Sequence, residues 1–137
     1  MKTGGCLCGA VRYEIQGELR DVVDCHCSKC RKFHGHYSAY TSVPVKDLKI
    51  VKSQNLKWYD STKDETAHVS RWFCSKCGSS LFWYPRSHEK ISVAAGSLDE
   101  PTGLQTMAHI WISQMGDYYK IYDDHPQYKR GRRKTPS

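Results

Sequence analysis

The 137-residue sequence contains no apolar run that approaches the ~18 residues needed for a membrane-spanning helix. It therefore predicts no membrane partner. It also lacks a helical stripe of three or more turns, which argues against a helical bundle. The first residues, Met1 to Gly5, include no apolar segment of the kind that directs export. Because cysteines stay reduced in the cytosol, we expect a cytoplasmic protein with free thiols.

Internal repeats are also absent, and the only biased segment is a basic stretch at the C-terminus. The net charge is +7, but five of these charges lie between Lys129 and Lys134, which leaves a net charge of only two for residues 1–128. A basic tail can grip phosphates or an acidic surface, but it is more often a solvated terminus, so the charge does not predict a nucleic-acid partner. We divide the chain into one domain, residues 1–128, and a basic disordered tail, residues 129–137, that folding and activity do not require.

Hydrophobic residues recur with a period of two. Val11, Tyr13 and Ile15 alternate with polar side chains, which is typical of a half-buried strand. Further short runs are rich in β-branched and aromatic residues and are separated by glycine and proline turns. We predict strands at 11–15, 37–43, 48–52, 56–60, 69–73, 80–84, 91–95 and 109–113, with a weaker candidate at 118–122. The only predicted helix covers residues 28–33, so the fold class is mainly β with little helix.

Seven cysteines fall into three close groups: Cys6-Leu7-Cys8, Cys25-His26-Cys27-Ser28-Lys29-Cys30 and Cys74-Ser75-Lys76-Cys77. Cysteines one or two residues apart are poorly placed to form disulfides with each other, but their thiolates can converge on one metal ion. Four thiolates complete a tetrahedral zinc site, whereas three leave a coordination position open, as in catalytic zinc sites. A disulfide framework with one unpaired cysteine is the alternative. The spacing favours two zinc ions.

The residues that follow each group indicate how the cysteines are shared. Gly9 follows the first group and Gly78 the third, and a glycine there lets the backbone turn back toward sulfur. Basic residues follow the central group instead. We therefore predict a structural zinc on the first and third groups and a catalytic zinc on the central one, with ligands Cys6, Cys8, Cys74 and Cys77 in the structural site and Cys25, Cys27 and Cys30 in the catalytic site. A zinc ribbon that joins Cys27 and Cys30 to Cys74 and Cys77 remains open, since spacing disfavours it only modestly.

Three stretches around these groups, residues 4–13, 25–32 and 73–79, resemble the signatures of the glutathione-dependent formaldehyde-activating enzyme family, which includes centromere protein V. Weaker likeness extends to 125–128. The resemblance implies a mainly β, zinc-pinned β-tent fold of short antiparallel strands, with one structural and one catalytic zinc. It also implies that a small thiol such as glutathione is joined to formaldehyde or a related aldehyde. The product is an S-hydroxymethyl adduct, so the reaction is that of a carbon–sulfur lyase in reverse.

Several side chains near the central cysteines are candidates to handle the substrate. Arg31 and Lys32, and also Arg71, can hold a carboxylate of the thiol. His34 and His36 can face the open site and transfer a proton if their segment is extended. The alternative for the basic residues is an ordinary exposed position, and the alternative for the two histidines is that they lie on opposite sides of a helical turn.

Two other classes of function deserve comparison. One is a non-catalytic zinc-binding thiol carrier or interaction module, which predicts retention of both metals without thiol chemistry. The other is a zinc hydrolase or nucleobase deaminase, which pairs H-x-E with P-C-x-x-C and uses the glutamate as acid and base. The sequence contains no H-x-E motif, so we discount a deaminase. His26, inside the central group, can replace a cysteine as ligand but more commonly points away.

Overall fold

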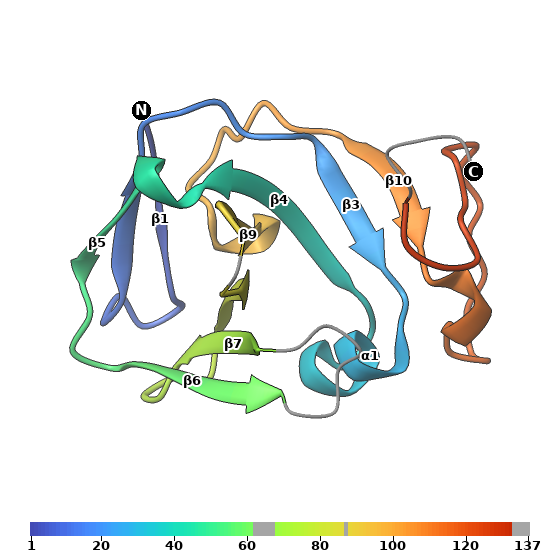
Figure 1. The fold of residues 1–137 in the computed structure, drawn as a ribbon, viewed down its shortest axis with the longest axis horizontal. Helices are drawn as coiled ribbons and strands as arrows, with labels where there is room; N and C mark the ends of the chain where they lie inside the picture. The colour runs from blue at the N-terminus through green and yellow to red at the C-terminus, as the bar shows by residue number, and fades with distance from the viewer. Residues whose placement is uncertain (62–67, 87, 133–137) are drawn as a thin grey trace.

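The structure is a computed structural model that describes residues 1–61, 68–86 and 88–132, and it is dominated by two β-sheets (Figure 1). The smaller sheet has the strand order β1 (Lys2–Gly5), β2 (Arg12–Ile15), β5 (Leu48–Lys52). The larger sheet has the order β10 (Thr106–Ile110), β3 (Val22–Cys25), β4 (Ser38–Pro44), β9 (Lys90–Ala94), β8 (Ser80–Pro85), β7 (Val69–Cys74), β6 (Leu56–Ser61). The mainly β prediction is confirmed.

Helical structure is limited to one short α-helix and three 3₁₀ turns within the described ranges. These are α1 (Ser28–His34), η1 (Val45–Asp47), η2 (Ala95–Ser97) and η3 (Ile112–Gln114). No helix among the described residues is long and apolar enough to cross a membrane. The predicted helix at 28–33 is therefore present and one residue longer.

Strand pairing is antiparallel throughout both sheets, with one exception at the edge: β10 pairs parallel with β3. The strands β1 and β3 were not predicted, because their sequences, KTGG and VVDC, do not alternate apolar and polar residues. The strand predicted at 109–113 lies instead at 106–110. It ends there because Trp111 has a left-handed backbone conformation (φ 58°) that begins η3. The weak candidate at 118–122 is not a strand.

The main core lies between the two sheets. Val11, Tyr13 and Ile15 are almost fully buried and point into it, as their alternation predicted. The Tyr13 ring packs edge-on against Phe82 of the larger sheet, with ring centroids 5.2 Å apart. Its hydroxyl is within 2.6 Å of the Ser97 hydroxyl, so the phenol retains a polar partner inside the core. Tyr13 thus ties the small sheet to the large one.

The helix α1 begins and ends for local reasons. Cys27 is the N-cap residue, and its sulfur accepts a hydrogen bond from the backbone N–H of Cys30 at 3.3 Å. Gly35 ends the helix with a positive φ of 83°, and its N–H donates to the carbonyl of Arg31 at 2.8 Å. The same chain segment that forms the helix therefore fixes the spacing of two central cysteines.

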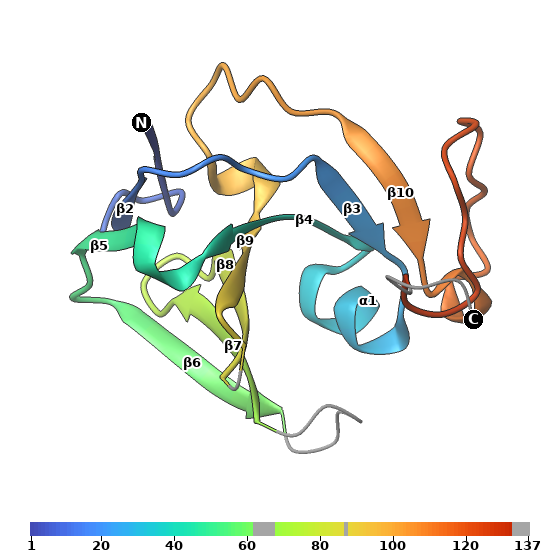
Figure 2. The ribbon, with the colours of Figure 1, turned by 45° about the horizontal axis from the view of Figure 1, so that its top comes forward.

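The C-terminal segment runs alongside β10 and η3 (Figure 2). The N–H of Trp111 donates to the carbonyl of Arg130 at 3.1 Å, and the N–H of Ser113 donates to that of Lys129 at 3.3 Å. Two residues that the sequence analysis assigned to the tail thus have backbone contacts with the domain. Residues 133–137 lie outside the described residues, and the domain boundary at 128 remains a prediction.

Candidate metal centres and the adjoining cavity

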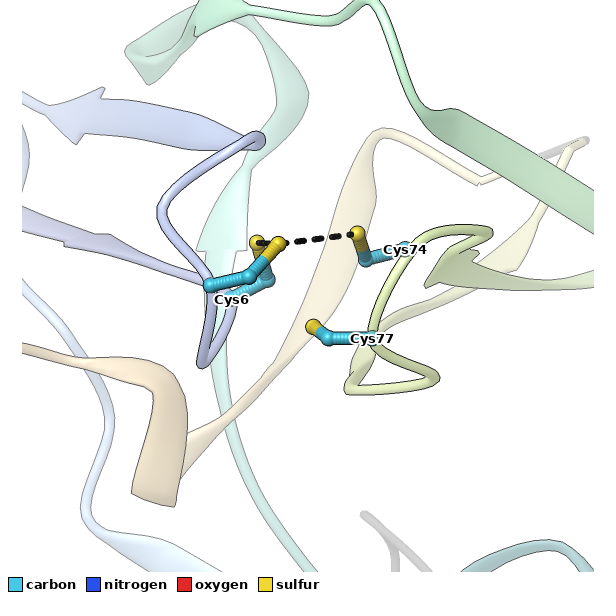
Figure 3. Close-up of side chains that lie close together, drawn as sticks. Cys6, Cys74 and Cys77 are labelled. Atoms are coloured by element: carbon cyan, nitrogen blue, oxygen red, sulfur yellow. Dashed lines mark hydrogen bonds between the residues drawn. The ribbon is translucent and has the colours of Figure 1, made fainter.

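The first and third cysteine groups meet at one point, as the sequence predicted. Cys6 and Cys8 lie on the loop between β1 and β2, and Cys74 and Cys77 lie at the β7–β8 turn (Figure 3). All four sulfurs lie within 4.8 Å of one another, with 3.6 Å between Cys6 and Cys8 and 3.8 Å between Cys8 and Cys74. Four thiolates at ~2.3 Å from a tetrahedral zinc would be ~3.8 Å apart. The donor set therefore fits a closed zinc site.

The turns that carry these cysteines have the geometry that their glycines predicted. Gly9 and Gly78 both have φ of 81°, and their N–H groups donate to the carbonyls of Cys6 and Cys74 at 3.2 and 2.8 Å. The N–H of Val11 donates to the Cys6 sulfur at 3.2 Å. Backbone donors of this kind stabilise thiolates and orient them toward a metal. This cluster also links the two sheets, because each contributes one loop.

The central cysteines form a second, separate cluster. Cys25 ends β3, Cys27 caps α1 and Cys30 lies in its first turn, and the three sulfurs lie within 4.8 Å of one another. The buried guanidinium of Arg71 approaches the Cys30 sulfur at 3.8 Å and lies over the ring of Phe33, 5.6 Å from its centroid. The zinc ribbon grouping is not what the structure shows, since Cys27 and Cys30 cluster with Cys25.

The central thiols strongly affect one another's ionisation. Hydrogen bonding with Cys27 raises the pKa of Cys25, and the same contact lowers the pKa of Cys27. A thiol stabilises a neighbouring thiolate by donating to it, but three thiolates at this separation repel one another. A divalent cation removes that repulsion and deprotonates thiols that coordinate it. Three sulfurs from six consecutive residues therefore fit a zinc site with one position left for another ligand.

A cavity of about 390 Å³ opens directly beside the central cluster. Its volume falls in the range of small-molecule sites, roughly 300–1,000 Å³. The four residues of the closed cluster do not line it. Its described wall combines the three central cysteines with aromatic, polar and cationic side chains: Arg20, Val23, Ser28, Lys29, Tyr40, Arg71, Trp83, Ser92, Ile110, Trp111 and Gln114.

Four of the predicted substrate-handling residues do not line this cavity. Arg31 donates to the carbonyl of Gln114 at 2.6 Å, and Lys32 is exposed. Both follow Cys30 along α1, but neither residue forms part of the cavity wall. The two predicted histidines do not reach the cavity either.

His36 bonds the exposed Tyr118 hydroxyl at 3.1 Å. His34 contacts a residue of the cavity wall, with its Nε2 2.9 Å from the hydroxyl of Tyr40. The expectation that these histidines face the open site depended on an extended segment, and His34 instead ends a helix.

Burial keeps His34 neutral. Loss of hydration, reinforced by the positive charge of Arg71, lowers the pKa of His34 to about 4. Burial, with the charge of nearby Cys30, raises the pKa of Tyr40 well above its usual range. The pair therefore presents a protonated phenol, backed by an uncharged imidazole, at the cavity wall.

A buried polar chain behind the central cluster was not identified from the sequence. Its centre is His109 on β10, whose Nδ1 lies 2.9 Å from Nε2 of His26 and whose Nε2 lies 2.9 Å from the carboxylate of Asp123. His26 also bonds the Tyr119 hydroxyl, and burial lowers its pKa to about 4. His26 thus points away from the metal cluster and joins β3 to the C-terminal segment. The sequence feature that could have indicated this polar chain is a histidine, His109, between two apolar residues of a strand.

Comparison with known proteins agrees with this arrangement. The sequence profile described as glutathione-dependent formaldehyde-activating enzyme matches residues 1–114. A Halomonas elongata protein that carries the same family name is 32% identical over 124 residues, which cover 86% of this chain and 79% of that protein. The crystal structure of a Rhodobacter sphaeroides protein, 33% identical, superposes with a TM-score of 0.57 and covers 72% of this chain and 88% of that one. The chain belongs to the glutathione-dependent formaldehyde-activating enzyme family.

Proposed function

We propose that the protein is a zinc-dependent enzyme of carbon–sulfur lyase type that joins a small thiol, such as glutathione, to formaldehyde or a related aldehyde. One observation carries the proposal: of two separate cysteine clusters, only the three-sulfur cluster borders the cavity. Cys6, Cys8, Cys74 and Cys77 hold a structural zinc in this proposal, and Cys25, Cys27 and Cys30 hold the catalytic one. Membership of the family supports the choice of thiol and aldehyde.

The reaction forms one carbon–sulfur bond and opens one carbonyl π bond. The thiol loses its proton, its sulfur attacks the aldehyde carbon, and the carbonyl oxygen gains a proton to give the S-hydroxymethyl adduct. A zinc ion held by Cys25, Cys27 and Cys30 would supply the deprotonation of a thiol that binds it. The protein has to place the aldehyde next to that sulfur, exclude bulk water and provide a proton donor for the oxygen.

Tyr40 is our candidate for that donor. It lines the cavity, its phenol is close enough to Cys30 to be affected by its charge, and it remains protonated at neutral pH. His34 holds the hydroxyl from behind and stays neutral. A phenol held in this way can donate a hydrogen bond to the oxygen as negative charge develops on it.

Adduct formation should be followed by exchange NMR, because the uncatalysed reaction is fast and a spontaneous rate is needed at each thiol concentration. We expect wild-type protein to accelerate exchange between glutathione, formaldehyde and their adduct. Cys27→Ser should remain folded and lose this acceleration. Tyr40→Phe should retain metal and thiol binding but slow the exchange. The matched control is Tyr59→Phe, at an exposed position on β6. If the wild-type protein binds the thiol but does not accelerate the exchange, the proposal that it is an enzyme is refuted, and the thiol carrier is the function that fits.

A further inference from the structure

The charge of the cavity wall carries information about the substrate beyond its thiol. Among the described residues that line the cavity are three cations, Arg20, Lys29 and Arg71, and no aspartate or glutamate. Arg71 is buried next to Cys30. Arg20 comes from the segment between β2 and β3. A cavity with this composition favours an anionic ligand, and its cations come from three different parts of the chain.

Arg20 is fixed in position by the backbone. Its Nε donates to the carbonyl of Asp21 at 3.0 Å and one terminal nitrogen donates to the carbonyl of Tyr40 at 2.9 Å. The carboxylate of Asp21 accepts from the N–H of Gln105 at 3.2 Å. A guanidinium has five N–H donors in a planar fork, and the two contacts with carbonyls use one side of it. The contacts hold the fork rigid at the cavity wall with further donors available to a ligand.

A second arginine reinforces this edge from the C-terminal segment. Arg132 lies close enough to Arg20 that its positive charge, after burial, contributes to lowering the pKa of Arg20. It is held over β10 by a contact with the sulfur of Met107 at 3.5 Å. Two residues earlier, the carbonyl of Arg130 accepts from the N–H of Trp111, which itself lines the cavity. Met107 lies on β10, which pairs with β3, the strand that follows Arg20, so Arg132 adds positive charge on the same side of the sheet edge. Such a charge increases the attraction for an anion at Arg20.

We propose that Arg20, assisted by Arg132, recognises a carboxylate of the thiol substrate, so that the cavity selects carboxylate-bearing thiols over neutral ones. The inference rests on the proposed function for the position of the thiol at the central cysteines. It assigns specificity to the segment before β3 and to the C-terminal segment, and not to Arg31 and Lys32 of α1, which do not line the cavity. It also gives the end of the chain a role that a solubilising tail does not have.

Binding should be measured calorimetrically on the zinc-loaded protein with three probes. Glutathione has a thiol and two carboxylates, S-methylglutathione has the carboxylates without a free thiol, and 2-mercaptoethanol has a thiol without a carboxylate. The variants are Arg20→Gln, Arg132→Gln and, as a matched control, Arg86→Gln, whose side chain pairs with Asp60 away from the cavity. Melting temperature and zinc content establish that each variant is folded and loaded.

We expect Arg20→Gln to weaken binding of glutathione and S-methylglutathione by about tenfold or more, the effect of losing a charge-assisted hydrogen bond. Binding of 2-mercaptoethanol should not change. Arg132→Gln should weaken binding of the same two probes by a smaller factor that depends on salt concentration. If Arg20→Gln does not fold, the binding measured with Arg132→Gln tests the proposal instead. Equal losses for all three probes, or no loss with either variant, would overturn the proposal. Intact carboxylate discrimination without accelerated adduct formation would refute only the proposed reaction.

Discussion

The two cysteine clusters should differ sharply in what they contribute to stability. Cys77→Ser removes one ligand from the cluster that joins the β1–β2 loop to the β7–β8 turn, and hence one sheet to the other. Structural zinc binding in small domains is largely folding free energy, about 10 kcal/mol or more. The total free energy of unfolding of a domain is only about 5–15 kcal/mol. Losing even half of the zinc contribution should leave the domain largely unfolded at 37 °C.

Cys27→Ser provides the matched comparison, since it replaces the same atom in the other cluster. Cys25, Cys27 and Cys30 lie within six consecutive residues, so their metal does not connect distant parts of the chain. We expect this variant to keep a cooperative thermal transition and to lose about one zinc per chain. The helix N-cap is retained, because a serine hydroxyl also accepts the hydrogen bond from the N–H of residue 30.

The assay is thermal unfolding by circular dichroism together with zinc analysis of each purified variant, with and without added zinc. A folded, cooperative Cys77→Ser protein combined with an unfolded Cys27→Ser protein would reverse the structural and catalytic assignments. Equal destabilisation by both would mean that neither cluster is purely structural.

Three further predictions test separate parts of the structure. A chelator titration followed by elemental analysis should remove two zinc ions per chain in two steps, the first from the central cluster because its open position admits the chelator; a single bound zinc would contradict the partition. Gly4→Ala should cost about 1–3 kcal/mol in urea unfolding, because a Cβ there overlaps the Tyr13 hydroxyl, whereas Gly96→Ala, with open space around it, should cost far less. Burial lowers the pKa of His34 to about 4 from 6.5, so as the pH falls the unfolded protein takes up a proton at this residue before the folded protein does. The contribution of His34 to the free energy of unfolding is therefore complete above pH 6.5 and declines toward pH 4. Between pH 5 and 7, His34→Gln should therefore show a flatter rise of unfolding free energy with pH than wild type, and parallel curves would show that His34 is not buried.

Much of the closed cluster could be predicted from the sequence, because its information is local. A C-x-C or C-x-x-C followed by glycine specifies a turn, and Gly9 and Gly78 adopt the positive φ that such a turn requires. The alternation of Val11, Tyr13 and Ile15 likewise reports directly which face of a strand is buried. Each of these signals depends on a few neighbouring residues and on backbone geometry that the rest of the fold does not alter.

Beyond the central cysteines and Arg71, the cavity wall could not be predicted, because its residues come from segments that only the sheet brings together. Arg31 and Lys32 stand next to Cys30 in sequence, but neither lines the cavity: Arg31 bonds the carbonyl of Gln114, and Lys32 is exposed. Arg71, which the sequence predicted as a candidate, does line the cavity beside Cys30. Arg20 was not predicted, and it reaches the cavity wall where its guanidinium donates to the carbonyl of Tyr40 on β4, the strand that pairs with β3. The sequence alone determined the fold class and the way in which the cysteines group, since both follow from residue type, spacing and local periodicity. Only the tertiary structure decided which charged side chains line the cavity, because that depends on long-range strand pairing.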